Sequence, residues 1–412
     1  MSFVDKAKKN SYIFVYWLVL SVIVGMVTGF AGAFFHKAIS FATLSRTEHP
    51  YLIYFLPLGG VAIAFMYRLS KDDLSTNTVI NCIRKSKSAS ALLAPLIFIG
   101  AFITHLFGGS AGREGAALQI GGGIGSRIAY RLHMNEEDAG IMMVCGMSGA
   151  FSAIFTTPVT AAVLALEIVS VGHMRYFQML PCIVSSICGF IITNSLGNAP
   201  LFYDIPNIPI LDAAMCIKVT VLGIICAFLS TLFCVTLHYS EKAMKKFFPK
   251  DYIRAFAGGC IIIVLTLAVG CRDYNGAGMD IIGKALSGEA KPEAFLLKLI
   301  FTAVTIGAGF KGGEIVPAFF VGSTFGAVLG GMIGIDPAFA AALSLVCVFC
   351  GIANCPLASV ILGVELFGSS GIIFFTLVCA ISFIVSGRFG LYRSQKIVYS
   401  QHGISHHEHY VK

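Results

Sequence analysis

The order of apolar and polar stretches along the chain predicts a membrane protein built of many helices. Apolar runs long enough to cross a bilayer alternate with short polar segments from residue 11 to residue 386. Polar segments cover 70–88 and 273–292, and a basic loop is expected at 241–254. The main apolar runs are Ser11–Phe35, Tyr51–Leu69, Ala89–Phe107, Ala139–Val171, Gln178–Leu196, Ala213–His238, Ala255–Gly270, Leu296–Phe310 and Ile372–Ser386.

A glycine-rich stretch from Gly108 to Gly125 interrupts this pattern and places Arg113 and Glu114 between apolar runs. The glycines before Glu114 disfavour a regular helix, whereas the residues after it favour one. A helix N-terminus carries unpaired N–H groups and about half a positive charge, so it attracts anions. The stretch therefore predicts an anion site whose own tethered anion is Glu114.

A second glycine-rich stretch repeats the first. With an offset of 314 − 114 = 200, Glu114 matches Glu314 and Gly112 matches Gly312. A proline followed nine residues later by a glutamate also occurs twice, at Pro158 with Glu167 and at Pro356 with Glu365, with an offset of 356 − 158 = 198. Paired interruptions of this kind indicate an internally duplicated transporter with its substrate site near the bilayer midplane.

The duplication and the loops suggest one integral domain made of two halves. The expected boundaries are a cytoplasmic N-terminal tail 1–10, a first half 11–197, a second half 198–395 and a cytoplasmic tail 396–412. No regulatory domain is expected after them.

Composition supports a membrane protein and narrows its chemistry. The chain is 57% hydrophobic and 12% charged, and soluble domains have about a quarter charged residues. Its net charge of +8 lies mostly in loops and tails, so it indicates topology and not nucleic-acid binding, and the lysines before residue 11 place the N-terminus in the cytoplasm. The 13 cysteines are scattered through apolar runs, which indicates that they pack in the core. The sequence shows no metal-binding or cofactor-binding pattern, and the histidines near the C-terminus are expected to lie in a solvated tail.

Several separated motifs carry a family resemblance. Gly112-Arg-Glu-Gly115 is similar to a Gly-(Lys/Arg)-Glu-Gly-Pro motif, Gly313-Glu-Ile-Val-Pro317 to a Gly-x-Phe-x-Pro motif, and Tyr392 stands at the place of an anion-coordinating tyrosine. With the two proline-to-glutamate segments, the chain resembles the CLC family of anion channels and anion/proton antiporters over nearly its full length. The resemblance implies an all-α polytopic fold with two inverted-repeat halves and broken re-entrant helices.

Departures from those motifs resemble the fluoride-exporting clade of that family. Ala116 replaces the motif proline, and Ser75-Thr-Asn77 stands where the family's Gly-Ser-Gly-Ile-Pro motif belongs. A glutamate, Glu314, precedes Ile315, which stands in place of the motif phenylalanine, and Ile168 follows Glu167 where common antiporters carry a second glutamate. Val316 differs from the threonine found there in some members of the clade, which leaves the proton pathway open.

The resemblance implies a proton-coupled halide antiporter that exports fluoride, with a chloride/proton antiporter or a chloride channel of the same fold as the alternative. Glu114 is the expected gate, because an intramembrane carboxylate is by default functional; the other interpretation is a helix cap. Glu314 is expected to handle protons or line the anion site; the other interpretation is an ion pair with Lys311 or Arg113.

The remaining expected site residues bind the anion: Thr76, Asn77, Arg113, Gly115, Ile315, Val316 and Tyr392. Thr76 and Asn77 could instead cap the next helix, and Arg113 could simply pair with a carboxylate. Glu167 and Glu365 are expected to be structural, with a proton-path role for Glu167 as the alternative.

The expected partners are small anions, protons and the lipid bilayer, in a homodimer of a bacterial inner or plasma membrane. An intramembrane enzyme is the third class considered. It would need paired aspartates, a nucleophile with its base or a zinc-binding histidine face, and His105 has no partner at helical spacing. We therefore expect a transporter and not an enzyme.

Overall fold

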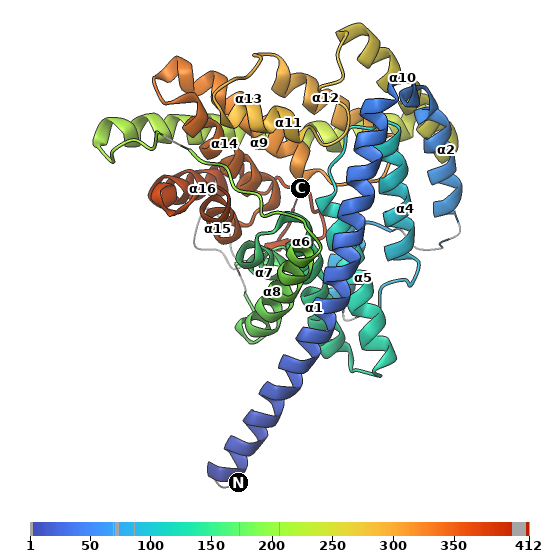
Figure 1. Ribbon diagram of the computed structural model, residues 1–412, viewed down its shortest axis with the longest axis vertical. Helices are drawn as coiled ribbons and strands as arrows, with labels where there is room; N and C mark the ends of the chain where they lie inside the picture. Colours follow the sequence, from blue (N-terminus) through green and yellow to red (C-terminus); the bar gives the residue numbers. More distant parts are fainter. Residues whose placement is uncertain are drawn as a thin grey trace.

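The computed structural model describes residues 3–68, 70, 74–85, 87–172, 174–205, 207–397 and 409–411, so most of the predicted tail 396–412 lies outside the described residues. The protein is a bundle of helices, and the long helix α1 runs along one side with its N-terminal end projecting beyond the rest (Figure 1). The helices are α1 Phe3–Glu48, α2 Leu56–Tyr67, α3 Thr76–Arg84, α4 Leu93–Leu106, α5 Glu114–Arg131, α6 Glu136–Phe155, α7 Pro158–Glu167, α8 Met179–Ser195, α9 Ala213–Phe247, α10 Asp251–Val269, α11 Met279–Leu286, α12 Ala294–Gly307, α13 Ile315–Ile333, α14 Pro337–Ala353, α15 Pro356–Phe367 and α16 Ile372–Ser386, with short 3-10 turns at Pro50–Phe55, Tyr176–Gln178 and Ser369–Gly371.

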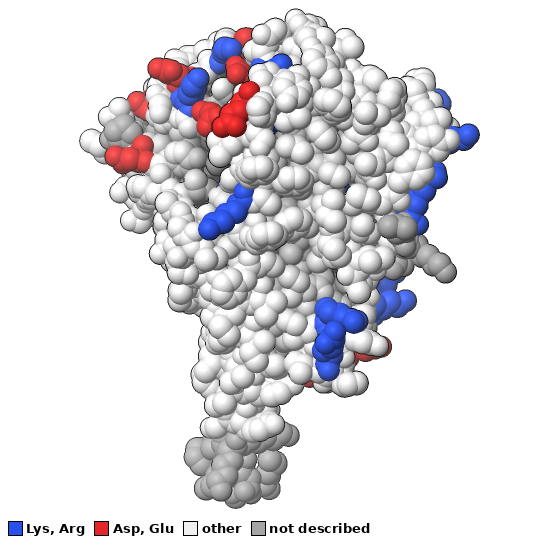
Figure 2. Space-filling model, turned by 45° about the vertical axis from the view of Figure 1, so that its right-hand side comes forward, with Lys and Arg blue, Asp and Glu red and all other residues white. Residues whose placement is uncertain are grey.

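The helices have the length and composition of membrane spans. Within the described residues, 8 are long and apolar enough to cross a bilayer. Figure 2 shows charged side chains at the upper left, along the right-hand side and at the lower right, and most of the remaining surface in this view is uncharged. Large uncharged surfaces are what a bilayer requires of the protein that it surrounds.

Two expected boundaries were wrong, and both polar segments contain helices. Helix α1 continues to Glu48 instead of ending near residue 35. The predicted basic loop 241–254 is mostly helical, because α9 continues to Phe247: Glu241 and Lys245 form an i,i+4 ion pair of 2.6 Å, and Met244 is buried. The polar segment 70–88 contains α3, and the polar segment 273–292 contains α11, whose buried residues Ile282, Ala285 and Leu286 follow a helical spacing.

The duplication is visible in the backbone as well as in the sequence. Thr156 ends α6 and Asn354 ends α14, and both residues adopt the left-handed conformation, with φ of 59° and 53°. A proline two residues later begins the next helix in each half. Since non-glycine residues rarely adopt positive φ, its recurrence at an offset of 354 − 156 = 198 identifies the same turn built twice.

Each half supplies a carboxylate that caps a helix of the other half. Glu167, at the end of α7, accepts hydrogen bonds from the backbone N–H groups of Leu357 (3.3 Å) and Ala358 (2.8 Å) at the start of α15. Glu365 on α15 accepts from the N–H groups of Val159 (2.9 Å) and Thr160 (2.8 Å) at the start of α7. These crossed caps satisfy N–H groups that have no partner within their own helices.

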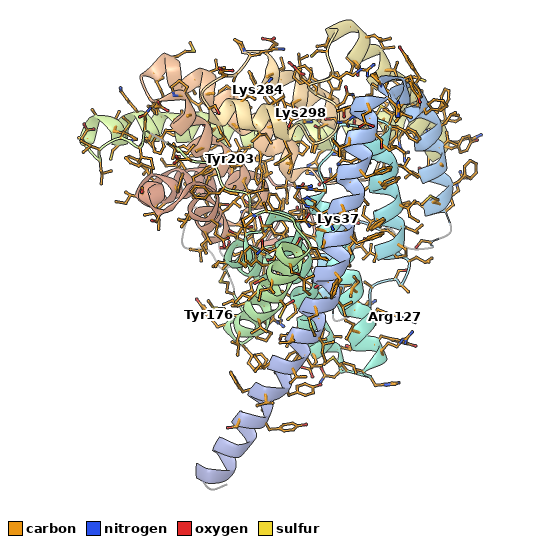
Figure 3. All side chains as sticks on the ribbon, in the orientation of Figure 1. Lys37, Arg127, Tyr176, Tyr203, Lys284 and Lys298 are labelled. Carbon is orange, nitrogen blue, oxygen red and sulfur yellow. The ribbon has the colours of Figure 1, made fainter. Side chains whose placement is uncertain are left out.

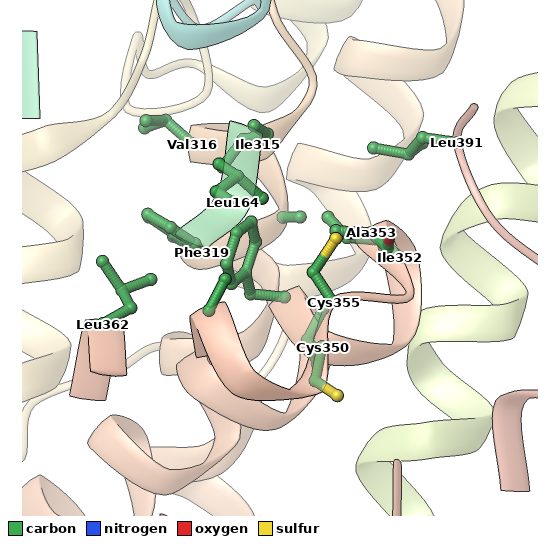
Figure 4. Packing of buried hydrophobic residues seen from close by; sticks show 14 of the residues in the cluster. Leu164, Ile315, Val316, Phe319, Cys350, Ile352, Ala353, Cys355, Leu362 and Leu391 are labelled. Carbon is green, nitrogen blue, oxygen red and sulfur yellow. Dashed lines mark hydrogen bonds between the residues drawn. The ribbon is translucent and has the colours of Figure 1, made fainter. Parts of the chain in front are cut away.

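Apolar packing surrounds the point where the two halves meet. Phe319 of α13 contacts the rings of Phe155 and Phe349 at 5.7 Å and 5.4 Å between centroids. Figure 4 shows side chains of α13, such as Val316 and Phe319, beside Leu164 of α7. This core holds the first turn of α13 against the first half of the chain.

A small sheet, which the sequence did not predict, joins distant segments. Strand β1 (Ser170–Val171) pairs in parallel with β2 (Lys396–Ile397), and β2 pairs antiparallel with β3 (His409–Tyr410). The side chains of Val171, Ile397 and Val411 form a buried apolar cluster there. The sheet therefore fixes the segment that follows Tyr392 to the end of α7.

The crossed caps predict a measurable loss of stability. Glu167→Ala or Glu365→Ala should each lower the free energy of unfolding by about 2–4 kcal/mol, because hydrogen bonds to a charged group contribute about 1.5–3 kcal/mol each. Thermal unfolding in detergent measures the change, and Glu137→Ala, at an exposed acid in the first turn of α6, is the matched control. Equal midpoints for the two cap variants and the control would contradict this account.

Candidate functional site

The candidate site lies where the glycine-rich stretches of the two halves touch. Gly112 and Gly313 exchange two backbone hydrogen bonds, each of 2.7 Å from N to O. Helix α5 begins at Glu114 and α13 begins at Ile315, directly after this bridge. The bridge therefore brings the N-termini of both helices to one place.

The glycines of the bridge are required by close approach of backbone to backbone. A Cβ atom on Gly313 would lie 2.5 Å from the backbone nitrogen of Gly115, and one on Gly115 would lie 3.0 Å from the Cα of Gly313. A side chain at either position would push the two helix ends apart.

Glu114 occupies the space between the two helix ends. Its side chain is only 1% exposed, and its Oε2 accepts a hydrogen bond of 2.8 Å from the backbone N–H of Arg113. The backbone N–H of Val316, in the first turn of α13, acts electrostatically on this carboxylate, and the Arg113 guanidinium lies 3.6 Å from it. The carboxylate thus lies beside backbone N–H groups of both halves, so a helix cap and an anion site would use the same groups.

Glu314 lies differently, although it occupies the repeated position. It is the residue before α13, it is half-buried, and it lines a cavity of about 780 Å³. Exposed Arg68, Lys245 and Asp251 mark the entrance of this cavity between α2, α9 and α10. Glu314 therefore faces an open cavity, whereas Glu114 is enclosed.

The expected ion pairs of Glu314 are replaced by other contacts. Arg113 pairs with Glu114, and the Lys311 ammonium lies 4.1 Å from the centre of the Tyr67 ring. Lys311 remains within electrostatic range of Glu314, as does Glu241 of α9.

Tyr392 lines the same cavity and is held by α3. Its side chain is 2% exposed, and its hydroxyl group has no hydrogen-bond partner among the described residues. Two residues later, Ser394 is fixed at three points: its N–H donates to Asn77 Oδ1 (3.0 Å), its hydroxyl accepts from Asn81 (2.7 Å) and its carbonyl accepts from Arg84 (2.8 Å). Helix α3 of the first half therefore positions the tyrosine of the second.

Thr76 and Asn77 do not cap α3, so that interpretation was wrong. Ser75 is the cap, and its hydroxyl accepts from the N–H of Thr78. Thr76 is buried in the cavity wall and accepts a hydrogen bond of 3.1 Å from Gln119 of α5.

A cationic group lies on another side of the bridge. Lys298 of α12 is fully buried and donates to the carbonyl groups of Tyr274 (3.2 Å) and Gly276 (2.6 Å). The loop that it holds covers the glycine-rich stretch, since Gly276 donates its N–H to Gly109. Figure 3 labels Lys298 and Tyr203 at the upper end of the molecule, opposite Arg127 near the end of α5.

The structure brings together the residues predicted from the sequence. Glu114, Gly115, Ile315 and Val316 meet at the bridge, and Thr76, Asn77, Glu314 and Tyr392 line the adjacent cavity. Sequence reasoning missed Gln119, Ser394 and Lys298. Gln119 lies five residues after Glu114 in an apolar run, and that position was the one available signal. No group of three metal-binding side chains occurs among the described residues.

Comparison with known proteins matches this architecture to a transport family. The model of the voltage gated chloride channel family matches residues 59–387. The chain belongs to this family. The expectation drawn from the glycine and proline motifs is thereby confirmed, and the chain is a multi-pass membrane protein with two inverted-repeat halves.

Individual members of the family are similar over nearly the whole chain. A chloride/fluoride channel protein of Pseudomonas syringae pv. tomato is 32% identical over 94% of this chain and 87% of its own length. The crystal structure of a CLC-type fluoride/proton antiporter is 29% identical, with a TM-score of 0.89, over 93% of this chain and 98% of that one. An H(+)/Cl(-) exchange transporter of Vibrio cholerae is 21% identical over 85% of this chain and 81% of its own length.

The bridge predicts a steric test of the site. Gly313→Ala should lower anion transport by at least about tenfold, because the new Cβ would meet the backbone of Gly115 at 2.5 Å and separate the two helix ends. Anion flux from liposomes measures this effect. The matched control is Gly283→Ala in α11, where a Cβ would meet nothing within 4 Å. Full transport by Gly313→Ala would show that the bridge does not define the pathway.

Proposed function

We propose that this protein exchanges fluoride for protons across a membrane and exports fluoride. The observation that carries the proposal is the position of Glu114, a buried carboxylate that lies at the N-termini of both half-helices, in the place that an anion would take. Both similar proteins named for fluoride cover more than nine-tenths of this chain, which supports the choice of ion.

Competition for one site couples the two ions. The ionised carboxylate is attracted by two helix N-termini and by Arg113. Protonation removes its charge and therefore most of that attraction, so the side chain can leave and an anion can enter. When the carboxyl group loses its proton, the carboxylate returns to the site and expels the anion. Movement of the proton is therefore linked to movement of the anion.

Glu314 is proposed as the second proton-handling group. It faces the open cavity and lies close to the bridge: its Oε2 is 3.5 Å from the place where a Cβ on Gly115 would be. A proton that leaves the site can therefore pass to a group in contact with the cavity. Tyr392, Thr76 and Asn77 supply hydroxyl and amide groups of the kind that a small, strongly hydrated anion needs.

A chloride/proton antiporter or a chloride channel of the same fold is the alternative. The exchange transporter of Vibrio cholerae supports it at lower identity. Glu314, together with Thr76 and Asn77 in place of a serine motif, favours fluoride over this alternative.

The proposed setting is a bacterial inner or plasma membrane, with two copies of the chain side by side. Helices α8 and α16 pack beside α7 and α15 and expose apolar residues such as Ile187, Ile191 and Ile373. A second copy would cover such residues, with one pathway in each subunit.

Flux measurements on reconstituted protein test the function. Fluoride flux should exceed chloride flux by at least about tenfold, and a fluoride gradient should drive protons uphill. Glu114→Ala should abolish proton movement and leave passive anion flux, because the side chain that links proton to anion is gone. A fluoride electrode and a pH electrode follow the two ions.

The control is Glu137→Gln, which alters an exposed acid remote from the site. Proton coupling that persists in Glu114→Ala would exclude Glu114 as the coupling group. Chloride flux equal to or above fluoride flux would favour the alternative function.

A further inference from the structure

Two buried polar atoms beside the site have no hydrogen-bond partner within the part of the chain that the structure describes. They are the side-chain carbonyl oxygen Oε1 of Gln119 and the hydroxyl oxygen of Tyr392. The two side chains are 5% and 2% exposed, and both line the cavity that Glu314 faces. A buried polar group without a hydrogen-bond partner is destabilising, so these atoms call for a ligand that is present in another state of the transport cycle.

The side-chain carbonyl oxygen of Gln119 is available to accept a hydrogen bond from a ligand. Its Nε2 donates to the hydroxyl oxygen of Thr76 at 3.1 Å. Gln119 follows Gly115 by four residues, so the two positions share one face of α5, and side chains on a helix lean towards its N-terminus. Glu314 Oε2 approaches this same face, at 3.5 Å from the Cβ position of Gly115.

We propose that Gln119 and Tyr392 form a receptor for the protonated carboxyl group of Glu314. This inference rests on the proposed function and names the residues that hold its transported proton. A protonated carboxyl group offers one O–H donor and one carbonyl acceptor. Gln119 Oε1 accepts the first, and the Tyr392 hydroxyl donates to the second, so both unsatisfied atoms gain a partner.

The receptor distinguishes the proton-loaded state from the other occupants of the cavity. An ionised carboxylate accepts a hydrogen bond from the Tyr392 hydroxyl, but it has no hydrogen to donate to the carbonyl oxygen of Gln119. A fluoride ion likewise can only accept. Only a group that carries a hydrogen fits both partners. Gln119 therefore stabilises protonated Glu314 without contributing a charge of its own.

Charged groups around Glu314 act on it from several elements. Lys311, on its own segment, favours the ionised form, and Glu241 of α9 favours the protonated form. Cys234 of α9 and Tyr392 also lie within its electrostatic range, and Glu114 acts on Tyr392 as well. Gln119 adds a directional hydrogen bond to this balance, and its effect can therefore be separated from that of the charges.

Two substitutions at residue 119 should act in opposite directions. Gln119→Met keeps the shape but removes the acceptor, so protonation of Glu314 should need more acid, and the pH dependence of fluoride flux should move down by about one pH unit. Gln119→Glu places a second carboxyl group beside Glu314, and one proton shared by two carboxylates is held more tightly, so the profile should move up. Flux from liposomes at a series of pH values measures both shifts.

Infrared spectroscopy supplies a readout that does not depend on transport. The carbonyl band of protonated Glu314, identified by its loss in Glu314→Gln, should move to higher frequency in Gln119→Met because the hydrogen bond of the carboxyl group to Gln119 is lost. The control is Gln178→Met, the same change at a buried glutamine that does not line the cavity. An unchanged band in Gln119→Met would overturn the proposal, as would shifts of the same sign in the two residue 119 variants.

The outcomes also separate this inference from the proposed function. Hydrogen fluoride has the same donor and acceptor pattern as a carboxyl group. If Gln119 and Tyr392 bound hydrogen fluoride instead, substitutions at residue 119 would shift the pH profile of fluoride flux but leave the carbonyl band of Glu314 unchanged. That outcome would overturn the proposal of a receptor for Glu314. Wild-type protein that moves no protons would contradict the proposed function itself. Wild-type coupling with unshifted residue 119 variants would overturn the receptor alone.

Discussion

The reciprocal backbone pair between Gly112 and Gly313 is the contact on which the rest of the structure depends. It holds two helix N-termini together inside the protein, where neither would be stable without a partner for its N–H groups. Glu114 lies where it can supply that partner, and in the proposed mechanism an anion supplies it when the carboxylate leaves. The proposed coupling rests on a geometry in which two positive helix ends share one place for a negative group.

The two halves use equivalent residues differently around this contact. Glu114 is the first residue of α5 and is enclosed, whereas Glu314 precedes α13 by one residue and faces the cavity. One position along the helix is enough to change the exposure of the carboxylate. An internal repeat can therefore give an enclosed carboxylate on one side and a carboxylate in contact with an open cavity on the other.

The sequence predicted those parts of the structure that depend on local pattern or repetition. The glycine-rich stretches, the repeated proline and glutamate positions and the placement of Glu114 all follow from residue types at fixed spacing. Gln119 and Ser394 were missed because their roles come from contacts across 43 and 313 residues, with Thr76 and Asn81. The end of α9 was misread because charged residues were taken for a loop, although Glu241 and Lys245 stabilise a helix by pairing.

The crossed caps of Glu167 and Glu365 have a consequence for the origin of the molecule. Each carboxylate serves the helix start of the other half, at equivalent positions, as in two identical chains packed in opposite orientations. An ancestral polypeptide of half the length, inserted in the bilayer both ways up, could have made the same four bonds between separate copies. Gene fusion would then have preserved a contact surface that was already self-complementary, and divergence of the two acids at the pore could have begun only after that event.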